Sequence, residues 1–291
     1  MVTRDDYRID EKPTWCPGCG DYGILNALTR ALVEHAIAPH ELMIVTGIGC
    51  GSKLPQYMRV NGMHTLHGRP WPAAQGAKLA NHGMRVMIIH GDGDGYGEGL
   101  GHFVHAVRRN PGVTEIVQNN KIYGLTKGQF SPTSEKGWKT STSPHGSAED
   151  PAQPLALAIT HGATFVARGY PGELKHLIWL IGEALEHPGY ALVDILQPCV
   201  SFNKPRTYDY YAERVYRLED ETGYNPANRT AAWERAQEWG ERIPIGIFYR
   251  AIPGPTFEML DPVLKEGAPL VKRPLEKLNS AQVESLLAKL R

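Results

Sequence analysis

The sequence lacks an excess of charge of either sign. Its 31 lysines and arginines balance its 31 aspartates and glutamates. A protein that neutralises many phosphates of a nucleic acid needs a surplus of basic side chains, because these displace the counterions of the phosphate backbone. We therefore expect no nucleic-acid partner.

Long apolar runs are also missing. No uninterrupted apolar stretch approaches the roughly 18 residues that a membrane-spanning helix needs, and the first residues, from Met1 to Lys12, are charged rather than apolar. We expect a cytoplasmic protein with no membrane segment and no export signal. The 291 residues, 42% of them hydrophobic, suffice for one large core or two modest ones.

Cysteine is scarce, with only Cys16, Cys19, Cys50 and Cys199 in the chain. Disulfides are rare in a reducing compartment, which favours metal or redox chemistry. Cys16 and Cys19 are separated by two residues, a spacing typical of metal ligands. Cys50 and Cys199 each stand alone, and a lone cysteine is most often a buried, inert thiol. Four thiolates suit a tetrahedral zinc ion or a four-iron four-sulfur cluster, and the spacing does not choose between them. A thioredoxin-like dithiol would leave two cysteines unexplained.

Apolar periodicity predicts alternating helices and strands. Helical spacing covers residues 20–36, 73–81, 100–109, 155–161 and 174–186, and strand-like runs cover 42–46, 85–90, 113–118, 164–167 and 191–196. This alternation is typical of an α/β protein with a mostly parallel sheet and helices on both faces.

Two regions do not fit the alternation. Residues 123–151 are rich in Gly, Ser, Thr, Pro and Lys, and so long a polar connection predicts a functional loop that becomes ordered around a ligand. Beyond Cys199 the chain is aromatic, charged and interrupted by prolines, with no clear sheet pattern. We therefore interpret residues 1–200 as one domain and residues 201–291 as an irregular C-terminal arm that packs on this domain or on a partner.

Polar side chains follow two of the expected strands. Gly91-Asp92-Gly93-Asp94-Gly95 ends one strand, and Asn119-Asn120 ends the next. The carboxyl ends of parallel strands meet at one edge of the sheet, where ligands usually bind. Asp92, Asn120 and a nearby backbone carbonyl would be oxygen ligands for magnesium, leaving positions for a diphosphate and water. The alternative is a tight turn at a strand end.

The glycines near Asp92 would allow a phosphate to approach the backbone, and the helix that begins near Glu98 would point its N-terminal amides at it. A dinucleotide fingerprint is not present, because Tyr96 occupies the third glycine position. The sequence also has no phosphate loop of the Gly-x-x-x-x-Gly-Lys-Ser/Thr type. The pattern therefore indicates a magnesium-diphosphate site of another kind.

This constellation is similar to the thiamine diphosphate motif. Together with other motifs it resembles the beta subunit of 2-oxoacid:ferredoxin oxidoreductases, from about residue 12 to near Tyr224. The additional motifs are Cys16-Pro17-Gly18-Cys19-Gly20, Gly47-Ile48-Gly49-Cys50, His67-Gly68-Arg69 and Tyr123-Gly124-Leu125-Thr126-Lys127-Gly128-Gln129. The stretch from Leu125 to Thr133 most resembles the 2-oxoglutarate type, also called 2-oxoglutarate synthase.

The resemblance implies a thiamine diphosphate-binding fold and assigns ligands. It implies that Cys16, Cys19, Cys50 and Cys199 hold one four-iron four-sulfur cluster, and that Asp92, Asn120 and the carbonyl of Ile122 hold Mg²⁺. The residues implied to bind the cofactor are Ile48, Gly49, Cys50, His67, Gly68, Gly91, Asp92, Gly93, Asp94, Asn120, Ile122, Gly124 and Leu125.

The resemblance also implies the reaction. A 2-oxoacid would lose carbon dioxide on thiamine diphosphate, the intermediate would be oxidised through the cluster, the acyl group would pass to coenzyme A, and ferredoxin would receive the electrons. For 2-oxoglutarate the product is succinyl-CoA. The reverse reaction, which fixes carbon dioxide, uses the same site, so the direction stays open.

No glutamate in this chain has a context that suits the aminopyrimidine of the cofactor. In the family this glutamate comes from the alpha subunit, so the resemblance implies a cofactor at a subunit interface, an assembly of two alpha-beta pairs, and no turnover by this chain alone.

Basic side chains are the candidates for recognising the substrate. Lys53 and Lys127 are candidates to pair with the second carboxylate of 2-oxoglutarate, and many pyruvate-type relatives have Gly in place of Lys127. Arg69, next to His67, is a candidate for contact with diphosphate or substrate. Solvated surface lysines and a structural ion pair of Arg69 are the alternatives. We assign no role to four further histidines, His64, His90, His102 and His105.

Three other functions stay open at this point. The enzyme could act on pyruvate or on a broad range of 2-oxoacids. It could be a thiamine-dependent lyase that decarboxylates without oxidation, with cysteines that bind zinc or nothing. In a third class, the chain would be a noncatalytic zinc-binding scaffold subunit with purely structural glycine turns.

Overall fold

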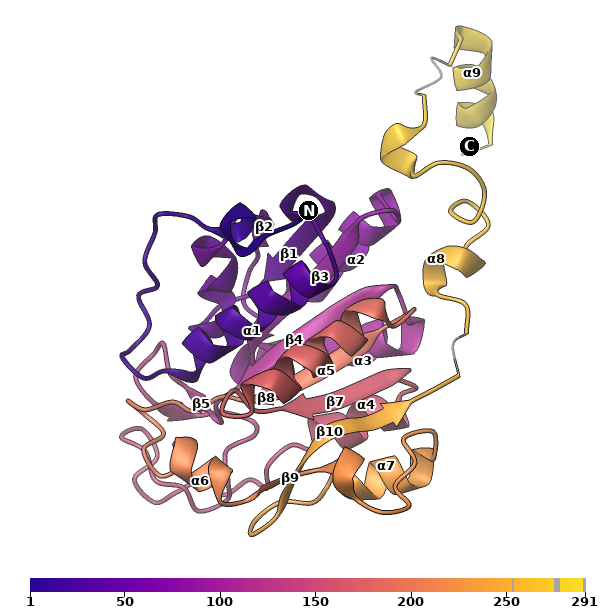
Figure 1. Ribbon diagram of the computed structural model, residues 1–291. Coiled ribbons are helices and arrows are strands. Elements are labelled where there is room, and N and C mark those ends of the chain that lie inside the picture. The colour runs from indigo at the N-terminus through magenta and orange to yellow at the C-terminus, as the bar shows by residue number, and fades with distance from the viewer. Residues whose placement is uncertain (253, 275–277, 290–291) are drawn as a thin grey trace.

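The computed structural model is a layered α/β structure built on one eight-stranded sheet (Figure 1). It describes residues 1–252, 254–274 and 278–289. The order of the strands is β2-β1-β3-β4-β8-β7-β10-β9. The strands of this sheet are β1 (Leu42–Thr46), β2 (Asn61–His64), β3 (Arg85–Gly91), β4 (Val113–Asn119), β7 (Phe165–Gly169), β8 (Ala191–Leu196), β9 (Val215–Arg217) and β10 (Ile243–Arg250). All pair in parallel except β10 with β7, which is antiparallel.

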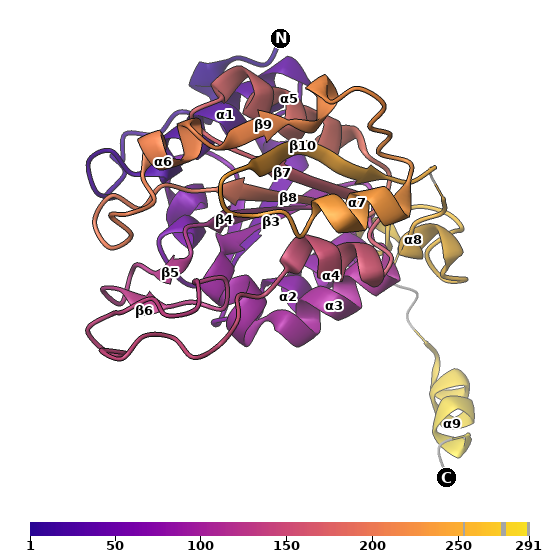
Figure 2. The same cartoon turned by 90° about the horizontal axis from the view of Figure 1, so that it is seen from below.

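Helices cover both faces of the sheet (Figure 2). Their bounds are α1 (Gly20–Glu34), α2 (Pro70–Ala80), α3 (Leu100–Arg109), α4 (Pro154–Thr160), α5 (Leu174–Glu186), α6 (Tyr208–Ala212), α7 (Arg229–Arg235), α8 (Phe257–Leu260) and α9 (Ser280–Ala288). Within the described residues, none of the helices is both long enough and apolar enough to span a membrane.

The helices on the two faces of the sheet pack into two different hydrophobic cores. Helices α1 and α5 pack on one face, where Met87 and Ile89 of β3 point. Helices α2, α3, α4 and α7 pack on the other face, where Val86 and Ile88 point. Because successive side chains of a strand point to opposite faces, a strand buried on both sides is mostly apolar. The buried polar exceptions have partners, as where Glu115 of β4 lies 2.8 Å from Nε2 of His90 of β3.

The predicted α/β class is confirmed, and several bounds coincide with the expected ones. Strands β1 and β8 and helices α3 and α5 begin and end at the predicted residues. The helical turn expected near Glu98 begins earlier, because a π-helical segment covers Gly93–Glu98. Strand β2 was not predicted, since all its residues are exposed and show no apolar alternation.

Two further strands lie in the part of the chain for which the sequence predicts an irregular arm. Strand β10 pairs with β7, and the short β9 pairs with β10. Pro244 and Gly246 lie inside β10, and both residues weaken a strand signal in sequence. Residues of β10 nevertheless complete the core, because Ile247 and Phe248 are buried on opposite faces of the sheet.

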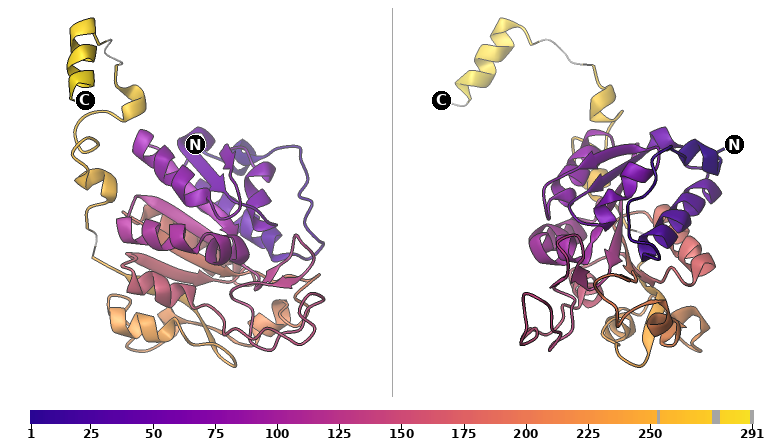
Figure 3. Two further views of the ribbon diagram at one scale, coloured as in Figure 1. Left: turned by 180° about the vertical axis from the view of Figure 1, so that it is seen from behind. Right: turned by 90° about the vertical axis from the view of Figure 1, so that its left-hand side faces the viewer.

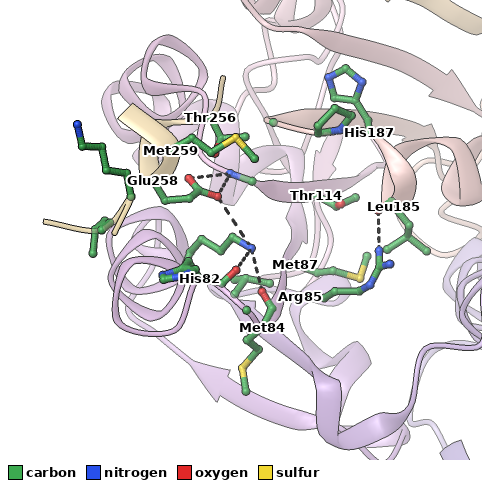
Figure 4. A pocket seen from close by; sticks show the side chains of 18 residues that line it. His82, Met84, Arg85, Met87, Thr114, Leu185, His187, Thr256, Glu258 and Met259 are labelled. Carbon is green, nitrogen blue, oxygen red and sulfur yellow. Dashed lines mark hydrogen bonds and ion pairs between the residues drawn. The ribbon is translucent and has the colours of Figure 1, made fainter. Parts of the chain in front are cut away.

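The chain after β10 runs along the amino-terminal edge of the sheet. Glu258 of α8 is buried there and accepts a hydrogen bond from the backbone N–H of Gly112 at 3.0 Å. Lys78, whose Nζ is 4.0 Å from Glu258, also donates to the carbonyls of His82 and Met84. The residues that make these contacts line a pocket of about 490 Å³ (Figure 4). Helix α9 stands away from the sheet (Figure 3).

Candidate cofactor and metal site

A second pocket opens at the opposite edge, where β1, β3 and β4 end. It has a volume of about 80 Å³, and every residue that the sequence assigns to the cofactor lines it except Gly68. The lining residues are Ile48, Gly49, Cys50, Gly51, His67, Gly91, Asp92, Gly93, Asp94, Asn120, Ile122, Tyr123, Gly124, Leu125 and Thr126. Segments that are distant in sequence thus meet at the carboxyl edge of a parallel sheet, the usual ligand position in this architecture.

The loop after β1 presents bare backbone to the pocket. Gly49 has φ +118°, a conformation that favours glycine, and a Cβ atom added there would meet no atom within 4 Å. A ligand can therefore approach this stretch of main chain closely. Such access fits the phosphate groups of a diphosphate, which bind to backbone amides.

Asp92 lies at the floor of the pocket and is only 1% exposed. Its Oδ2 accepts hydrogen bonds from the hydroxyls of Ser131 and Thr133, at 2.5 and 2.6 Å. Burial raises the pKa of Asp92, and the two hydroxyls oppose that shift. A buried carboxylate with one oxygen held by donors suits a cation as its remaining partner.

The two asparagines after β4 have different surroundings. Asn119 donates its amide to Asp194 at 3.1 Å, away from the pocket. Asn120 lines the pocket, and its Oδ1 accepts from the backbone N–H of Ile122 at 3.0 Å. Asp92, Asn120 and the main chain of Ile122 therefore share one pocket, as the predicted magnesium site requires. Among the described residues, no three His, Cys, Asp or Glu side chains gather as ligands of one ion. The magnesium set contains only one such side chain.

Asp94 has a different role from Asp92. Its Oδ1 accepts from the backbone N–H of Ile48 at 2.9 Å and of Gly68 at 2.8 Å, and it lies 2.8 Å from Nδ1 of His67. This fully buried carboxylate thus ties the loop after β1 to the loop before α2. Nδ1 of His67 also lies 3.4 Å from Oε2 of Glu98.

Replacing Asp94 with alanine is expected to lower the free energy of unfolding by about 2–4 kcal/mol, because two backbone N–H groups lose their acceptor. Asp94→Asn keeps an acceptor oxygen and should lose less. Urea denaturation measures both effects, with Asp150→Ala as the control, since Asp150 is exposed and pairs only with Lys136 at the surface. Equal stability of Asp94→Ala and the wild type would contradict this role.

The four cysteines lie near the same end of the molecule. The sulfurs of Cys50 and Cys199 are each 3.8 Å from the position that a Cβ atom on Gly124 would occupy. Cys19 accepts a hydrogen bond from Nε2 of Gln197 at 3.1 Å, and Cys16 is exposed. The four sulfurs do not converge as they would around one zinc ion. Among the described residues, the cysteines are thus not brought together as a metal site, and the four-iron four-sulfur cluster stays a prediction.

Burial changes the ionisation of these thiols. It raises the pKa of Cys50 to about 11, and it raises the pKa values of Cys19 and Cys199. A bound metal supplies the positive charge that keeps such thiolates deprotonated. Asp21, which the sequence analysis did not single out, is buried beside Cys19, and burial raises its pKa to about 7.

The three predicted catalytic cations do not line the pocket. Lys53 is half-buried after Cys50, with Nζ 3.4 Å from the hydroxyl of Thr14. Lys127 is exposed in the turn between β5 (Ile122–Tyr123) and β6 (Gln129–Phe130), with φ +76°. Arg69 is exposed and donates to the carbonyls of Gly68 and Glu98.

Sequence reasoning missed several residues of the site. Tyr123, Gly51 and Thr126 line the pocket. Ser131 and Thr133 do not line it but form hydrogen bonds with Asp92. All except Gly51 lie in the polar loop or at its start, and that loop is the signal that could have identified them. It packs inward at Ser131 and Thr133, which are both buried.

The pocket at the amino-terminal edge is larger but lacks this chemistry. Half-buried Lys78 and buried Glu258 pair with each other and with backbone groups there. We compared the described residues that line the two pockets. Only the pocket at the carboxyl edge has polar ligand residues at the ends of strands. We therefore place the functional site at the carboxyl edge.

Known families match most of the chain. Residues 47–195 match the thiamine pyrophosphate enzyme C-terminal TPP-binding domain, which supports thiamine diphosphate as the cofactor. Residues 199–266 match the C-terminal region of the pyruvate ferredoxin oxidoreductase beta subunit. The second match covers the part of the chain in which β9 and β10 were not predicted.

Individual relatives agree with these families. The chain is 46% identical to the beta subunit of 2-oxoacid:ferredoxin oxidoreductase 1 from Aeropyrum pernix, over 84% of this chain and 79% of that protein. It is 38% identical to the 2-oxoglutarate synthase subunit KorB of Archaeoglobus fulgidus, over 70% and 77%.

A solved structure has the same fold. It is the 2-oxoglutarate:ferredoxin oxidoreductase from Magnetococcus marinus with 2-oxoglutarate, coenzyme A and succinyl-CoA bound. The TM-score is 0.84 at 39% identity, and the match covers 88% of this chain and 87% of that chain. These matches confirm the resemblance seen in the motifs. The chain belongs to the beta subunits of the 2-oxoacid:ferredoxin oxidoreductases.

Proposed function

We propose that the chain binds the diphosphate half of thiamine diphosphate through Mg²⁺, holds one four-iron four-sulfur cluster, and works with an alpha subunit. The complex would decarboxylate 2-oxoglutarate oxidatively, form succinyl-CoA and carbon dioxide, and reduce ferredoxin. The single observation that carries this proposal is the pocket itself, because it gathers the predicted cofactor residues at the carboxyl edge of the sheet.

The proposed cluster would lie beside this pocket. Cys50 lines the pocket, and the sulfurs of Cys50 and Cys199 both lie close to Gly124, which lines it as well. Electrons leaving a substrate in the pocket would therefore travel only a short way to iron. This proximity favours oxidation over a lyase reaction that ends with decarboxylation.

The residues of this chain have defined tasks in the proposed mechanism. Asp92, Asn120 and the carbonyl of Ile122 would bind Mg²⁺, and the backbone around Gly49 would hold the diphosphate. Asp94 would keep the ring of His67 oriented toward the bound ligand. Bound thiamine diphosphate would supply the electron sink that stabilises negative charge on the substrate after carbon dioxide leaves.

A partner is needed to complete the site. The pocket of about 80 Å³ is far smaller than the roughly 300–1,000 Å³ of most ligand pockets. Leu125, on its rim, is 46% exposed. Both features support a half-site that an alpha subunit closes, while providing the glutamate for the aminopyrimidine. Two alpha-beta pairs would form the assembly.

Lys53 and Lys127 remain the proposed determinants of substrate choice. Replacing Lys127 with glycine removes the side chain and suits φ +76°, so the backbone of the turn is not strained. We expect activity on 2-oxoglutarate to fall at least about tenfold more than activity on pyruvate, because the distal carboxylate loses a charged partner. Lys53→Ala is the parallel test.

Steady-state kcat/KM values with both 2-oxoacids give the ratio. Lys136→Ala is the control, since Lys136 is exposed in the same loop and pairs with Asp150. An unchanged ratio in Lys127→Gly would remove Lys127 from the specificity argument, and an unchanged ratio in both variants would favour a broad 2-oxoacid enzyme.

Anaerobic purification of the complex tests the proposed function as a whole. Metal, sulfide and cofactor analysis should find iron, sulfide, Mg²⁺ and thiamine diphosphate, and a panel of 2-oxoacids should show ferredoxin reduction that depends on coenzyme A. A colourless protein loaded with zinc that decarboxylates without reducing ferredoxin would indicate the lyase. Zinc without cofactor binding would indicate the scaffold.

A further inference from the structure

We propose that Ser131 and Thr133 are positioning residues for Mg²⁺, and that through them the polar loop 123–151 is coupled to metal binding. This inference rests on the proposed function, because it takes Asp92, Asn120 and Ile122 as the magnesium ligands. It assigns a task to residues 131–134, which neither the strand-end argument nor the pocket lining includes.

Both hydroxyls hold the same oxygen of Asp92. Ser131 Oγ and Thr133 Oγ1 donate to Oδ2 at 2.5 and 2.6 Å. The two side chains are 2% and 1% exposed, so water does not compete for these bonds. With Oδ2 fixed, the plane of the carboxylate is fixed, and Oδ1 is left for the cation. Hydrogen bonds to a ligating carboxylate commonly set metal affinity in this way.

The same segment is tied to the other two proposed ligands. Lys121 stands between Asn120 and Ile122 in the chain, and its Nζ donates to the carbonyl of Thr133 at 2.6 Å. In return, the hydroxyl of Ser134 donates to the carbonyl of Lys121 at 2.6 Å. Residues 131–134 therefore connect the Asp92 side of the site to the Asn120–Ile122 side.

The coupling between this segment and metal binding is reciprocal. If the segment holds the ligands in place and so tightens metal binding, then metal binding must stabilise the segment by the same free energy. Lys136 and Lys139 follow this segment closely in the chain and are exposed, while Glu135 pairs with Arg206 and accepts a hydrogen bond from Trp239. Bound Mg²⁺ should therefore protect the loop from proteolysis at these lysines.

The first test measures the Mg²⁺ concentration at half-saturation of thiamine diphosphate binding, by calorimetry on the complete alpha-beta complex. Ser131→Ala and Thr133→Val should each raise it roughly tenfold, and the double variant roughly 100-fold. Thr133→Ser keeps the hydroxyl and should behave like the wild type. Ser147→Ala is the control, because Ser147 is buried in the same loop but contacts no proposed ligand.

The second test follows trypsin cleavage of the loop with and without Mg²⁺ and thiamine diphosphate. The ligands should slow cleavage in the wild type and in Thr133→Ser, but not in the double variant at the same Mg²⁺ concentration. A wild-type Mg²⁺ requirement in Thr133→Val and Ser131→Ala would overturn the inference and leave the proposed function intact. Absence of Mg²⁺-dependent cofactor binding in the wild type would overturn both.

Discussion

The variant Asp92→Asn is expected to lose Mg²⁺-dependent binding of thiamine diphosphate, with an affinity at least about 100-fold lower than the wild type. Loss of a residue that merely orients a metal ligand already costs roughly 10–100-fold, and Asp92 is the only negatively charged side chain in the proposed magnesium set. An amide oxygen carries no net charge, so it binds a hard dication much less well than a carboxylate.

The fold should survive this change. The amide oxygen of asparagine still accepts a hydrogen bond from Ser131 or Thr133. The variant also no longer buries a charge, and it is this burial that raises the pKa of Asp92. Calorimetry on the alpha-beta complex measures cofactor binding, and thermal unfolding without ligands verifies folding. Asp150→Asn is the matched control, because it removes the same charge from an exposed position. Unchanged cofactor affinity in Asp92→Asn would exclude the magnesium site.

The second large effect is expected for Cys199→Ser. We expect this variant to retain less than about a tenth of the iron and sulfide of the wild type, and ferredoxin reduction should fall to background. A hydroxyl is a much poorer ligand for iron than a thiolate, and a cluster that loses one ligand becomes labile. Cys199 is 8% exposed and close to Cys50 across Gly124, so no other cysteine can replace it.

Cofactor binding separates this result from misfolding. Thiamine diphosphate should still bind to Cys199→Ser, because the magnesium ligands are untouched. Ser52→Ala is the control, since Ser52 is buried two residues after Cys50 and its hydroxyl has no hydrogen-bond partner in the described structure. Full iron content and full activity in Cys199→Ser would show that Cys199 is a structural thiol, which is the ordinary role of a lone buried cysteine.

The layered core could be predicted from sequence because burial on both faces imposes a strong pattern. Strands β4 and β8 are buried along their whole length, and α5 places a broad apolar face on the sheet. Strand β10 escaped prediction because Pro244 and Gly246 interrupt it, and its place in the sheet depends on the distant partner β7. Tertiary pairing, rather than local preference, forms this strand.

The gathering of the candidate residues at one edge was also predictable, since parallel strands bring their ends together there. The roles of neighbouring residues were not. Asn119 and Asn120 are identical in type, yet one faces Asp194 and the other lines the pocket. Asp94 was expected to bind cofactor directly, while the structure also shows it holding two loops together through backbone N–H groups. Such differences depend on packing that no spacing rule contains.

Long side chains were the hardest to assign. Lys53, Lys127 and Arg69 were chosen for their charge, but none of them lines the pocket of this chain. A flexible cation can extend several ångströms, and its partner could belong to the alpha subunit or to the substrate. The sequence determines the position of such a residue in the chain, whereas the position of its charged group depends on the complete assembly.

The proposed function requires a thiamine diphosphate site and an iron–sulfur cluster side by side in this chain. An anaerobic single-turnover experiment on the alpha-beta complex tests it most directly, by following the visible absorbance of the cluster after 2-oxoglutarate and coenzyme A are added. We expect the absorbance to bleach in the wild type, to stay constant in Asp92→Asn, and to recover when oxidised ferredoxin is supplied. A complex that releases carbon dioxide with no change in visible absorbance would contradict this arrangement.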